Sequence, residues 1–487
     1  MNILHMTSEI HPLIKTGGLA DVSRSLPVAL QSLGENIRLF VPGYRNLLAA
    51  LNDTHEVMDS FPYGVLPAKA RLLAADLPGS SIPLWILDCP ALFDRGGGPY
   101  QDDEGQDWPD NPLRFGAFCR AAAWLVQNQH SSILDWSIDL IHCHDWQTAL
   151  TPALLKFWHC PVPTVLTIHN LAFQGNFPAS WINTLGLPAQ EFHLESLEFH
   201  GQLSFLKAGL VHADAITTVS PRYAREIQTP QMGCGLDGLL RHRSAALSGI
   251  LNGIDELWCP DNDPLLTHHY SITKKAPKAL NKAHLQQRLG LEVSPQAFLV
   301  GLVSRLTLQK GIDLVLDSLD DMLADKSVQL VVLGSGDLDM ERRLAHWNSR
   351  KPDQVHIALG FNEVLSHQII AGADLFLMPS RFEPCGLAQM YAMTYGTPPL
   401  VHHTGGLADT VTPYQPGISP RRQQGTGFVF ETAHSYELKS CFKIAKSCFH
   451  DPAEWNKVVH NAMKKSFRWD RAAQEYQTLY NKLLKPT

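Results

Sequence analysis

The chain has 487 residues, of which 45% are hydrophobic and 18% are charged, and its formal net charge is −7. This composition allows large buried cores, and the length suggests two or three domains rather than one. The negative charge and the lack of a long Lys/Arg stripe argue against a nucleic-acid partner, because such proteins neutralise phosphates with clustered cations.

The composition also indicates where the protein works. No run reaches the roughly 18 consecutive apolar residues that a membrane span needs, and the first residues have no basic segment followed by a long apolar run. The nine cysteines are scattered singly, which does not suit a disulfide framework or a CxxC metal site. We therefore expect a cytoplasmic protein with reduced thiols and no membrane partner.

Strand-length apolar runs alternate with helical patterns along the whole chain, which predicts two doubly wound parallel sheets in tandem, an α/β fold. The strand candidates are residues 3–6, 37–41, 84–87, 140–142, 164–168 and 215–219, then 298–303, 329–333, 355–358, 374–378 and 399–401. We place an N-terminal domain at 1–248, a C-terminal domain at 249–460, and a helical segment at 461–487 that crosses back to the first domain. A loop rich in Gly, Asn, Asp and Pro at 249–263 is the expected hinge.

The segment Thr-Gly-Gly-Leu-Ala-Asp occurs at residues 16–21, directly after Lys15, and again at residues 404–409. Each copy is predicted to lie in a tight turn between a strand and a helix. Paired glycines let backbone amides approach a ligand, and the helix dipole favours an anion, so the repeat predicts phosphate binding. A glycine-rich turn used twice for packing is the alternative.

Two loops of the second half carry charge directly after predicted strands, where open α/β sheets bind ligands. Arg305 and Lys310 follow strand 298–303, and Glu383 follows strand 374–378. A guanidinium fork with an ammonium suits a diphosphate leaving group, although a pair of solvated surface cations is the alternative. A carboxylate at Glu383 could hold sugar hydroxyls or stabilise a cationic centre.

In the first half, the segment His-Cys-His-Asp-Trp at 142–146 and His169 also follow strands. A zinc site is discounted because no second ligand cluster completes four ligands. Asp145 and Trp146 suit a sugar, with a carboxylate for hydroxyls and an aromatic face for the ring. An Asp that caps the next helix beside a core Trp is equally open. The Gly-Ser-Gly at 334–336 and the Asp-x-Asp pairs at 261–263 and 337–339 are interpreted as structural.

Together these segments resemble the bacterial glycogen synthases and plant starch synthases. The resemblance spans nearly the whole chain, and the segments that carry it are 15–19, 98–100, 107–111, 144–146, 167–170, 252–255, 304–306 with 310–311, 380–387 and 404–407. It implies a GT-B fold, with two Rossmann-like domains facing across a deep cleft. It also implies retaining transfer of glucose from ADP-glucose to the nonreducing end of glycogen or another α-1,4-glucan, without a metal or pyridoxal phosphate.

The resemblance implies residue roles as well. The implied catalytic residues are Glu383, Asp145, Arg305, Lys310 and His169, whose backbone carbonyl would face the anomeric carbon. The implied donor contacts are Lys15, Thr16, Gly17, Gly18, Asp21, Asn252, Ser304, Phe361, Cys385, Gly386, Leu387, Thr404, Gly405 and Gly406. The implied acceptor contacts are Tyr100, Asp110, Asn111 and Trp146.

Three positions depart from the family's usual pattern or from the wider GT-B class. Phe361 stands where the family usually has Tyr, and Cys259 where it usually has Asn. Tyr391 replaces the second Glu of the wider class, as it does in the synthases themselves. A glucan phosphorylase, a UDP-glucose donor and a non-catalytic glucan-binding relative are the competing interpretations. The sequence leaves the oligomeric state open.

Overall fold

The computed structural model describes residues 1–51, 53–131 and 134–485. Contacts divide the chain into two compact units: unit 1 comprises Met1–Gly253 and Trp469–Thr487, and unit 2 comprises Ile254–Arg468. The sequence placed its domain boundaries after residues 248 and 460, a few residues before these positions. Among the described residues, no helix is both long and apolar enough to cross a membrane.

Unit 2 is built on a six-stranded sheet whose paired strands all run parallel. In spatial order the strands are β15 (Val355–Leu359), β14 (Val328–Gly334), β13 (Phe298–Val303), β16 (Leu375–Met378), β17 (Pro399–His402) and β18 (Phe428–Phe430). This is the order of a dinucleotide-binding fold, in which the chain reverses direction beside its first strand. The switch point therefore lies between β13 and β16.

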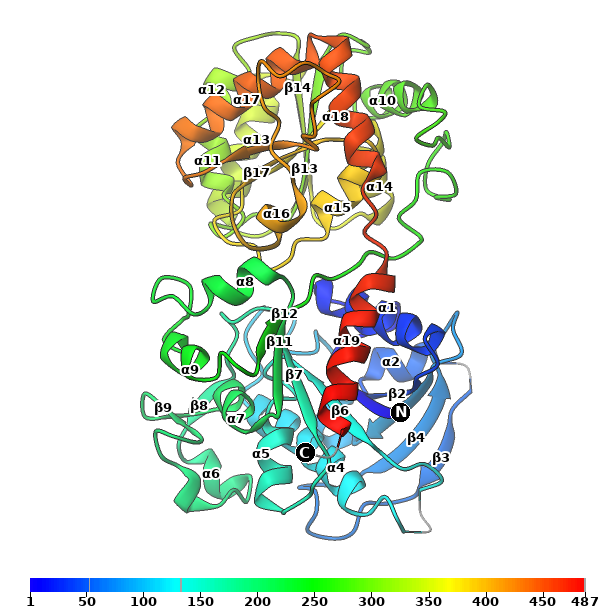
Figure 1. Cartoon of the computed structure of the whole chain (residues 1–487), viewed down its shortest axis with the longest axis vertical. Helices are drawn as coiled ribbons and strands as arrows, with labels where there is room; N and C mark the ends of the chain where they lie inside the picture. The colour runs from blue at the N-terminus through cyan, green and yellow to red at the C-terminus, as the bar shows by residue number, and fades with distance from the viewer. Residues whose placement is uncertain (52, 132–133, 486–487) are drawn as a thin grey trace. The chain divides into compact units, whose positions relative to one another are not determined.

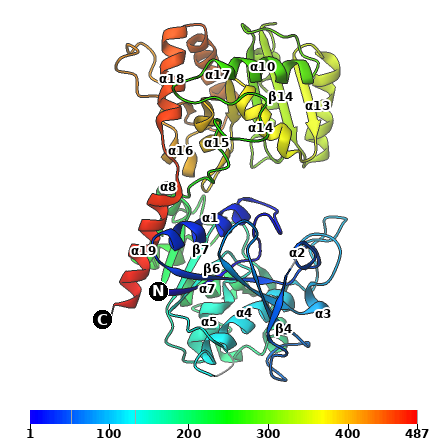
Figure 2. The same ribbon diagram turned by 90° about the vertical axis from the view of Figure 1, so that its right-hand side faces the viewer.

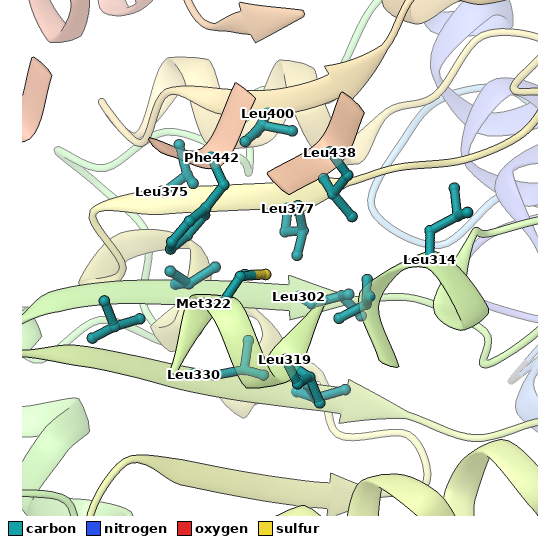
Figure 3. Close-up of a cluster of buried hydrophobic side chains, with 14 of the residues drawn as sticks. Leu302, Leu314, Leu319, Met322, Leu330, Leu375, Leu377, Leu400, Leu438 and Phe442 are labelled. Atoms are coloured by element: carbon teal, nitrogen blue, oxygen red, sulfur yellow. The ribbon is translucent and has the colours of Figure 1, made fainter. Parts of the chain in front are cut away.

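Helices pack around this sheet (Figure 1): α10 (Pro277–Arg288), α11 (Ile312–Leu316), α12 (Leu319–Met322), α13 (Leu338–Arg350), α14 (Glu363–Gly372), α15 (Ala388–Thr394), α16 (Gly405–Thr410), α17 (Ser435–Phe449) and α18 (Pro452–Lys464). In Figure 3, Leu302 and Leu377 point toward Leu314, Leu438 and Phe442 of the neighbouring helices, forming one buried cluster. The apolar sequence of β13, and of β14 apart from the buried Gln329, reflects burial on both faces of these strands.

Unit 1 has a nine-stranded sheet. In spatial order its strands are β12 (Leu247–Gly249), β11 (Ala215–Thr218), β7 (Thr164–Ile168), β6 (Leu140–His144), β1 (Asn2–Met6), β2 (Asn36–Pro42), β5 (Pro83–Asp88), β4 (Arg71–Asp76) and β3 (His55–Met58). Strands β3 and β4 run antiparallel to their neighbours, so the prediction of a purely parallel sheet is wrong at this edge. The switch point of this sheet lies between β1 and β6.

A small antiparallel sheet of unit 1 contains β8 (Asn176–Pro178), β10 (Gln202–Ser204) and β9 (Glu198–Phe199). The helices of the unit are α1 (Gly18–Ser32), α2 (Arg45–Ala50), α3 (Pro90–Phe93), α4 (Asn111–Gln127), α5 (Leu150–Phe157), α6 (Trp181–Thr184), the 3₁₀ helix η1 (Ala189–Glu191), α7 (Phe205–His212), α8 (Pro221–Glu226), α9 (Asp237–His242) and α19 (Trp469–Leu484).

The C-terminal helix α19 packs within unit 1, beside α1 in both views (Figures 1 and 2). Its side chains Trp469, Tyr476 and Tyr480 are buried in one cluster with Ile3 of β1 and Leu26 of α1. Gly253 lies so close to Trp469 that a Cβ added there would be 2.7 Å from the Trp469 backbone nitrogen. The C-terminal helix thus packs against the N-terminal strand and the first helix of the chain.

The expected hinge at 249–263 is only partly a loop between units. From Ile254 onward it belongs to unit 2, where the Trp258 ring stacks between His367, at 3.7 Å between ring centroids, and Tyr391, at 3.9 Å. Asp263 is fully buried and accepts hydrogen bonds from His367 and the Tyr395 hydroxyl. The Asp-x-Asp pair at 261–263 is therefore structural, as the sequence indicated.

Candidate functional site

In unit 2, the loops that follow β13 and β16 bring Lys310 and Glu383 together. The Lys310 Nζ lies 2.5 Å from Glu383 Oε2, and both side chains are largely buried, with exposed fractions of 16% and 10%. Ser380 donates a hydrogen bond of 3.1 Å to the same carboxylate oxygen. Because β13 and β16 flank the switch point, the pair lies where an open α/β sheet binds its ligand.

The two loops are also joined through their backbones. The Arg381 amide donates to the Gln309 carbonyl at 2.8 Å, and the Arg381 guanidinium pairs with Asp313 of α11. Gly311 adopts a left-handed φ of +69°, and a Cβ there would be 2.2 Å from the Pro379 carbonyl oxygen. Only glycine fits this contact, so the sequence fixes how closely Lys310 approaches the Glu383 loop.

The second Thr-Gly-Gly copy packs against the Glu383 loop. The Gly406 amide donates to the carbonyls of Glu383 and Pro384, at 3.1 and 3.2 Å. A Cβ at Gly405 would lie 2.0 Å from the Glu383 carbonyl oxygen, and one at Gly406 would lie 2.0 Å from that of Cys385. These glycines therefore serve close backbone packing, the alternative that the sequence left open, and the Gly406 amide is used within the protein.

The other predicted donor residues of unit 2 lie in the same loops or beside them. Arg305 is exposed after β13, where the Ser304 hydroxyl donates to its carbonyl at 3.1 Å. Phe361 follows β15 and is 86% exposed, so its ring is available for stacking. Gln389 Nε2 donates to the carbonyls of Cys385 and Gly386, which positions the turn that ends at Leu387.

In unit 1, Asp145 and His169 follow the neighbouring strands β6 and β7. The Asp145 Oδ1 accepts a hydrogen bond of 2.7 Å from the His169 amide and one of 3.4 Å from the Asn170 amide. Asp145 is thus not the cap of α5, and its φ of +56° turns the backbone sharply at the strand end. Burial raises the pKa of the Asp145 carboxyl to about 7, against the opposing effect of the two amide donors.

A network of buried histidines includes His169 and continues from it into the sheet of unit 1. His144 Nδ1 is 2.8 Å from His169 Nε2, and His142 is held by the hydroxyls of Thr167 and Tyr480 at 2.6 and 2.8 Å. Burial lowers the pKa of His169, and that of the neighbouring His5, to about 3. These imidazoles are therefore neutral at neutral pH.

His5 completes a trio with His142 and His144 whose ligand atoms lie within 4.8 Å of one another. Sequence reasoning missed this trio because it requires β1 to lie beside β6. Both ring nitrogens of His142 already have hydrogen-bond partners, and a buried dication would face no carboxylate or thiolate in the trio. We assign no metal centre to it.

The first Thr-Gly-Gly copy is organised by a residue that sequence analysis missed, Glu9. Its carboxylate accepts from the Thr16 amide at 2.6 Å, the Gly17 amide at 3.1 Å and the Thr16 hydroxyl at 2.6 Å. Residues 7–17 separate β1 from α1, so the predicted tight turn is wrong for this copy. Glu9 follows β1 closely, and the search for charged residues after strands could have found it.

Lys15 and Asp21 flank this loop and form an ion pair of 2.7 Å, with exposed fractions of 40% and 23%. Helix α1 begins at Gly18. A Cβ added at the adjacent Gly17 would have no heavy atom within 4 Å among the described residues. The glycines of the two copies are thus in different surroundings. A Cβ at Gly17 of the first copy would have free space around it, whereas a Cβ at Gly405 or Gly406 of the second copy would overlap backbone atoms.

The predicted acceptor residues lie around Tyr100, whose hydroxyl donates to Glu9 at 2.7 Å. Asn111 donates to the Tyr100 carbonyl, and Asp110 pairs with Arg95 at 2.8 Å. Trp146 is 9% exposed in a cluster of aromatic rings, as a core residue would be. Asn252 of the predicted donor set is buried, and its Oδ1 has no partner among the described residues.

Two family models match the chain. One described as "Starch synthase catalytic domain" matches residues 2–242, and one described as "Glycosyl transferases group 1" matches residues 287–440. The glycogen synthase of Thioalkalivibrio sulfidiphilus (strain HL-EbGR7) is 46% identical over 99% of this chain and 100% of the relative. That of Marinobacter nauticus (strain ATCC 700491 / DSM 11845 / VT8) is 48% identical over 99% of this chain and 98% of the relative.

Solved structures are similar as well. The catalytic domain of starch synthase IV from Arabidopsis thaliana, bound to ADP and acarbose, has a TM-score of 0.86 and 31% identity, with 99% of each chain covered. Sucrose-phosphate synthase from Thermosynechococcus elongatus has a TM-score of 0.60 and 16% identity, covering 99% of this chain and 98% of that one. The second likeness bears on the fold alone.

Proposed function

Because the chain belongs to the family of glycogen and starch synthases and shares their GT-B fold, we propose that it transfers glucose from ADP-glucose to the nonreducing end of an α-1,4-glucan, releasing ADP and retaining the α configuration. The observation that carries this proposal is the largely buried Lys310–Glu383 pair at the switch point of unit 2. It offers a sugar-binding carboxylate and a cation at one place.

In unit 2, Arg305 and Lys310 would stabilise the diphosphate as the glycosidic bond breaks and negative charge grows on the leaving group. Glu383 would accept hydrogen bonds from glucosyl hydroxyls, with the turn at Cys385, Gly386 and Leu387 beside it. The Lys310 ammonium holds the Glu383 carboxylate in one orientation, so the sugar meets a group that is already positioned. Phe361 offers an exposed ring on which adenine can stack.

In unit 1, the His169 carbonyl would face the anomeric carbon, and Asp145 would hold hydroxyls while fixing the His169 amide. Lys15 would add a further cation for the donor phosphates. Tyr100, Asp110 and Asn111 would contact the acceptor glucan. Our hypothesis for the chemical step is front-face substitution through an ion-pair-like state, in which the departing phosphate helps to deprotonate the incoming hydroxyl.

We further propose that the reaction needs neither a metal ion nor pyridoxal phosphate. Arg305, Lys310 and Lys15 would supply the positive charge that a divalent cation otherwise brings to a diphosphate. Turnover should therefore be unchanged after treatment with EDTA, and the purified protein should lack the visible absorbance of a pyridoxal Schiff base. A large loss of activity that Mg²⁺ or Mn²⁺ restores would contradict this part of the proposal.

The product of the reaction tests the proposal most sharply. Glycogen is incubated with the protein and ADP-[¹⁴C]glucose, and the labelled polymer is digested with β-amylase, which removes maltose from nonreducing α-1,4 ends. We expect nearly all of the label to be released as maltose. Label in free glucose would indicate hydrolysis, and label that resists β-amylase would contradict the linkage. Incorporation only from UDP-glucose would leave the family intact and overturn the donor.

A further inference from the structure

The loop of residues 15–18, which we call the donor loop, is held by the buried side chain of Glu9. Glu9 is 3% exposed, and its Oε2 accepts from the Thr16 and Gly17 amides at 2.6 and 3.1 Å. The residues of the donor loop are themselves exposed, so this carboxylate fixes two amides at the protein surface. Two amides that the sequence predicts to face an anion thus already face one.

The other oxygen of the same carboxylate reaches the acceptor segment, residues 98–111. Glu9 Oε1 accepts from the Tyr100 hydroxyl at 2.7 Å and from the Thr16 hydroxyl at 2.6 Å. The Ser8 hydroxyl lies 2.7 Å from the Tyr100 oxygen, and it is the donor there because the Tyr100 proton is directed to Glu9. We call the four hydrogen bonds of the Glu9 carboxylate the Glu9 link. It joins the donor loop to the acceptor segment.

The charge of Glu9 also acts on its neighbours. All four donors of the Glu9 link are neutral groups. Burial raises the pKa of Tyr100 well above its usual range and the Glu9 charge adds to this effect, so the phenol keeps the proton that it donates. Burial is likewise the main reason that the pKa of Asp145 is raised to about 7, and the Glu9 charge adds to it. Glu9 therefore lies among the residues assigned to the reaction in unit 1.

We propose that Glu9 is a positioning residue that couples the acceptor segment to the donor loop, an inference that rests on the proposed function. A glucan that binds at Tyr100 restricts the motion of that side chain, and the Glu9 link extends the restriction to the Thr16 and Gly17 amides. Lys15 precedes these amides, so its backbone is ordered before the donor phosphates arrive and less entropy is lost when they bind. ADP-glucose thus binds more strongly when an acceptor is present.

A purely structural Glu9 link would behave differently. Breaking it would lower the stability of unit 1, but the KM for ADP-glucose of the folded enzyme would not change. Coupling predicts instead that the loss of one oxygen in the acceptor segment weakens the binding of the donor. The substitution Tyr100→Phe removes only that oxygen and keeps the aromatic ring, so it separates the two cases.

Hydrogen exchange tests the Glu9 link without turnover. In Tyr100→Phe, amide exchange in peptides that contain residues 15–18 should quicken by roughly fivefold, because Glu9 loses one of the groups that hold it in place. Tyr44→Phe is the matched control, since the Tyr44 hydroxyl is buried in the same unit and has no partner among the described residues. It should exchange as the wild type does. Unchanged exchange in Tyr100→Phe would overturn the proposal, whether or not the protein transfers glucose.

Steady-state kinetics at saturating glycogen tests the coupling itself. Tyr100→Phe should raise the KM for ADP-glucose roughly threefold to tenfold, the range expected for one lost hydrogen bond. When Glu9→Ala has already broken the link, adding Tyr100→Phe should raise this KM no further. Glu9→Gln should recover most of the loss in Glu9→Ala, because its amide oxygen can accept from both backbone amides while its NH₂ group donates to the two hydroxyls.

Two kinetic results would overturn the coupling while leaving the proposed function intact. One is a KM for ADP-glucose that Tyr100→Phe leaves unchanged. The other is a rise in this KM that is equally large with and without Glu9, which would indicate that Tyr100 contacts the donor directly. If Glu9→Ala does not fold, the exchange and the KM of Tyr100→Phe still decide the proposal, because neither measurement needs a Glu9 variant.

Discussion

Lys310 and Glu383 are 73 positions apart in sequence and 2.5 Å apart in the structure. Their exposed fractions, 16% and 10%, set this pair apart from the surface ion pairs of the chain, which are worth little to stability. Burying an ion pair costs desolvation energy that the attraction between the two charges does not always repay. We infer that its value lies in holding the Glu383 carboxylate ready for the sugar.

Replacing Glu383 with Gln should lower kcat/KM for ADP-glucose by roughly 100-fold or more, about 3 kcal/mol, because a group that stabilises the transition state is lost. Lys310→Met and Arg305→Met should show losses of similar size. The matched control is Lys439→Met, since Lys439 also pairs with a carboxylate, Asp321, at 2.8 Å. It should keep full activity. Steady-state kinetics on folded variants would measure this, and undiminished turnover in all three site variants would contradict the mechanism.

The buried histidines give unit 1 a pH dependence of known sign. His5 and His169 have pKa values lowered to about 3, so the unfolded chain binds more protons than the native state below about pH 6.5. Each should cost up to roughly 2 kcal/mol of stability between pH 7 and pH 5. Asp145 acts in the opposite sense, because its raised pKa stabilises the native state as the pH falls below 7.

The histidines outnumber the single carboxyl, so stability of unit 1 should fall on acidification over this range. Chemical denaturation at pH 7, 6 and 5 would measure the slope. His5→Gln should flatten it, whereas His268→Gln, at a partly exposed position of unit 2, should leave it unchanged. A stability that rises from pH 7 to pH 5 in the wild type would show that the imidazoles are not buried as neutral groups.

At the scale of elements, the two Thr-Gly-Gly copies show how one sequence serves two physical purposes. The first copy lies over a carboxylate, Glu9, and has space above Gly17. The second turns with a φ of +44° at Gly405 and packs onto the Glu383 carbonyl. The helix that follows is long in the first case, at 15 residues, and short in the second, at 6.

Equivalent substitutions in the two copies should therefore differ. Gly405→Ala should destabilise unit 2 by roughly 2 kcal/mol or more, since the new Cβ would overlap a backbone oxygen in a left-handed turn. Gly17→Ala should change stability by less than about 0.5 kcal/mol, because its Cβ would meet no described atom and its backbone is extended. Urea denaturation of the two variants would decide this, and equal losses would refute the packing role.

The predictable elements were those whose signal is local. Strands such as β7 and β13 were located residue for residue, because burial on both faces gives an uninterrupted apolar run. Strands β3 and β4 were missed, since a short antiparallel edge leaves no such run. The same limit applies to the site: loops after strands revealed Lys310 and Glu383, whereas the histidine trio depends on strand order that no local pattern encodes.

At the scale of the whole molecule, the chain returns at its end to the unit in which it began. Helix α19 buries Tyr476 and Tyr480 against β1 and β6. The Tyr480 hydroxyl is hydrogen-bonded to His142 of the buried histidine network. The C-terminal residues thus complete the core of unit 1. Truncation of α19 should therefore destabilise β1 at the other end of the sequence.

Tyr476→Ala should destabilise unit 1 by roughly 3–5 kcal/mol, as expected for deletion of a buried aromatic ring. Hydrogen exchange should quicken in β1 and β6 while β13 and β16 of unit 2 stay protected. Tyr436→Ala is the control, because Tyr436 is 72% exposed on α17. Faster exchange confined to unit 2, or no change in β1, would show that α19 does not belong to the core of unit 1.

Glucose transfer from ADP-glucose to a glucan by means of the Lys310–Glu383 site can be tested in one assay. The most direct measurement is nucleotide release from ADP-glucose and UDP-glucose, with and without glycogen, for the wild type and Glu383→Gln. We predict ADP release that depends on glycogen in the wild type and falls by roughly 100-fold or more in the variant. ADP release that is independent of glycogen, or equal in both proteins, would contradict this function.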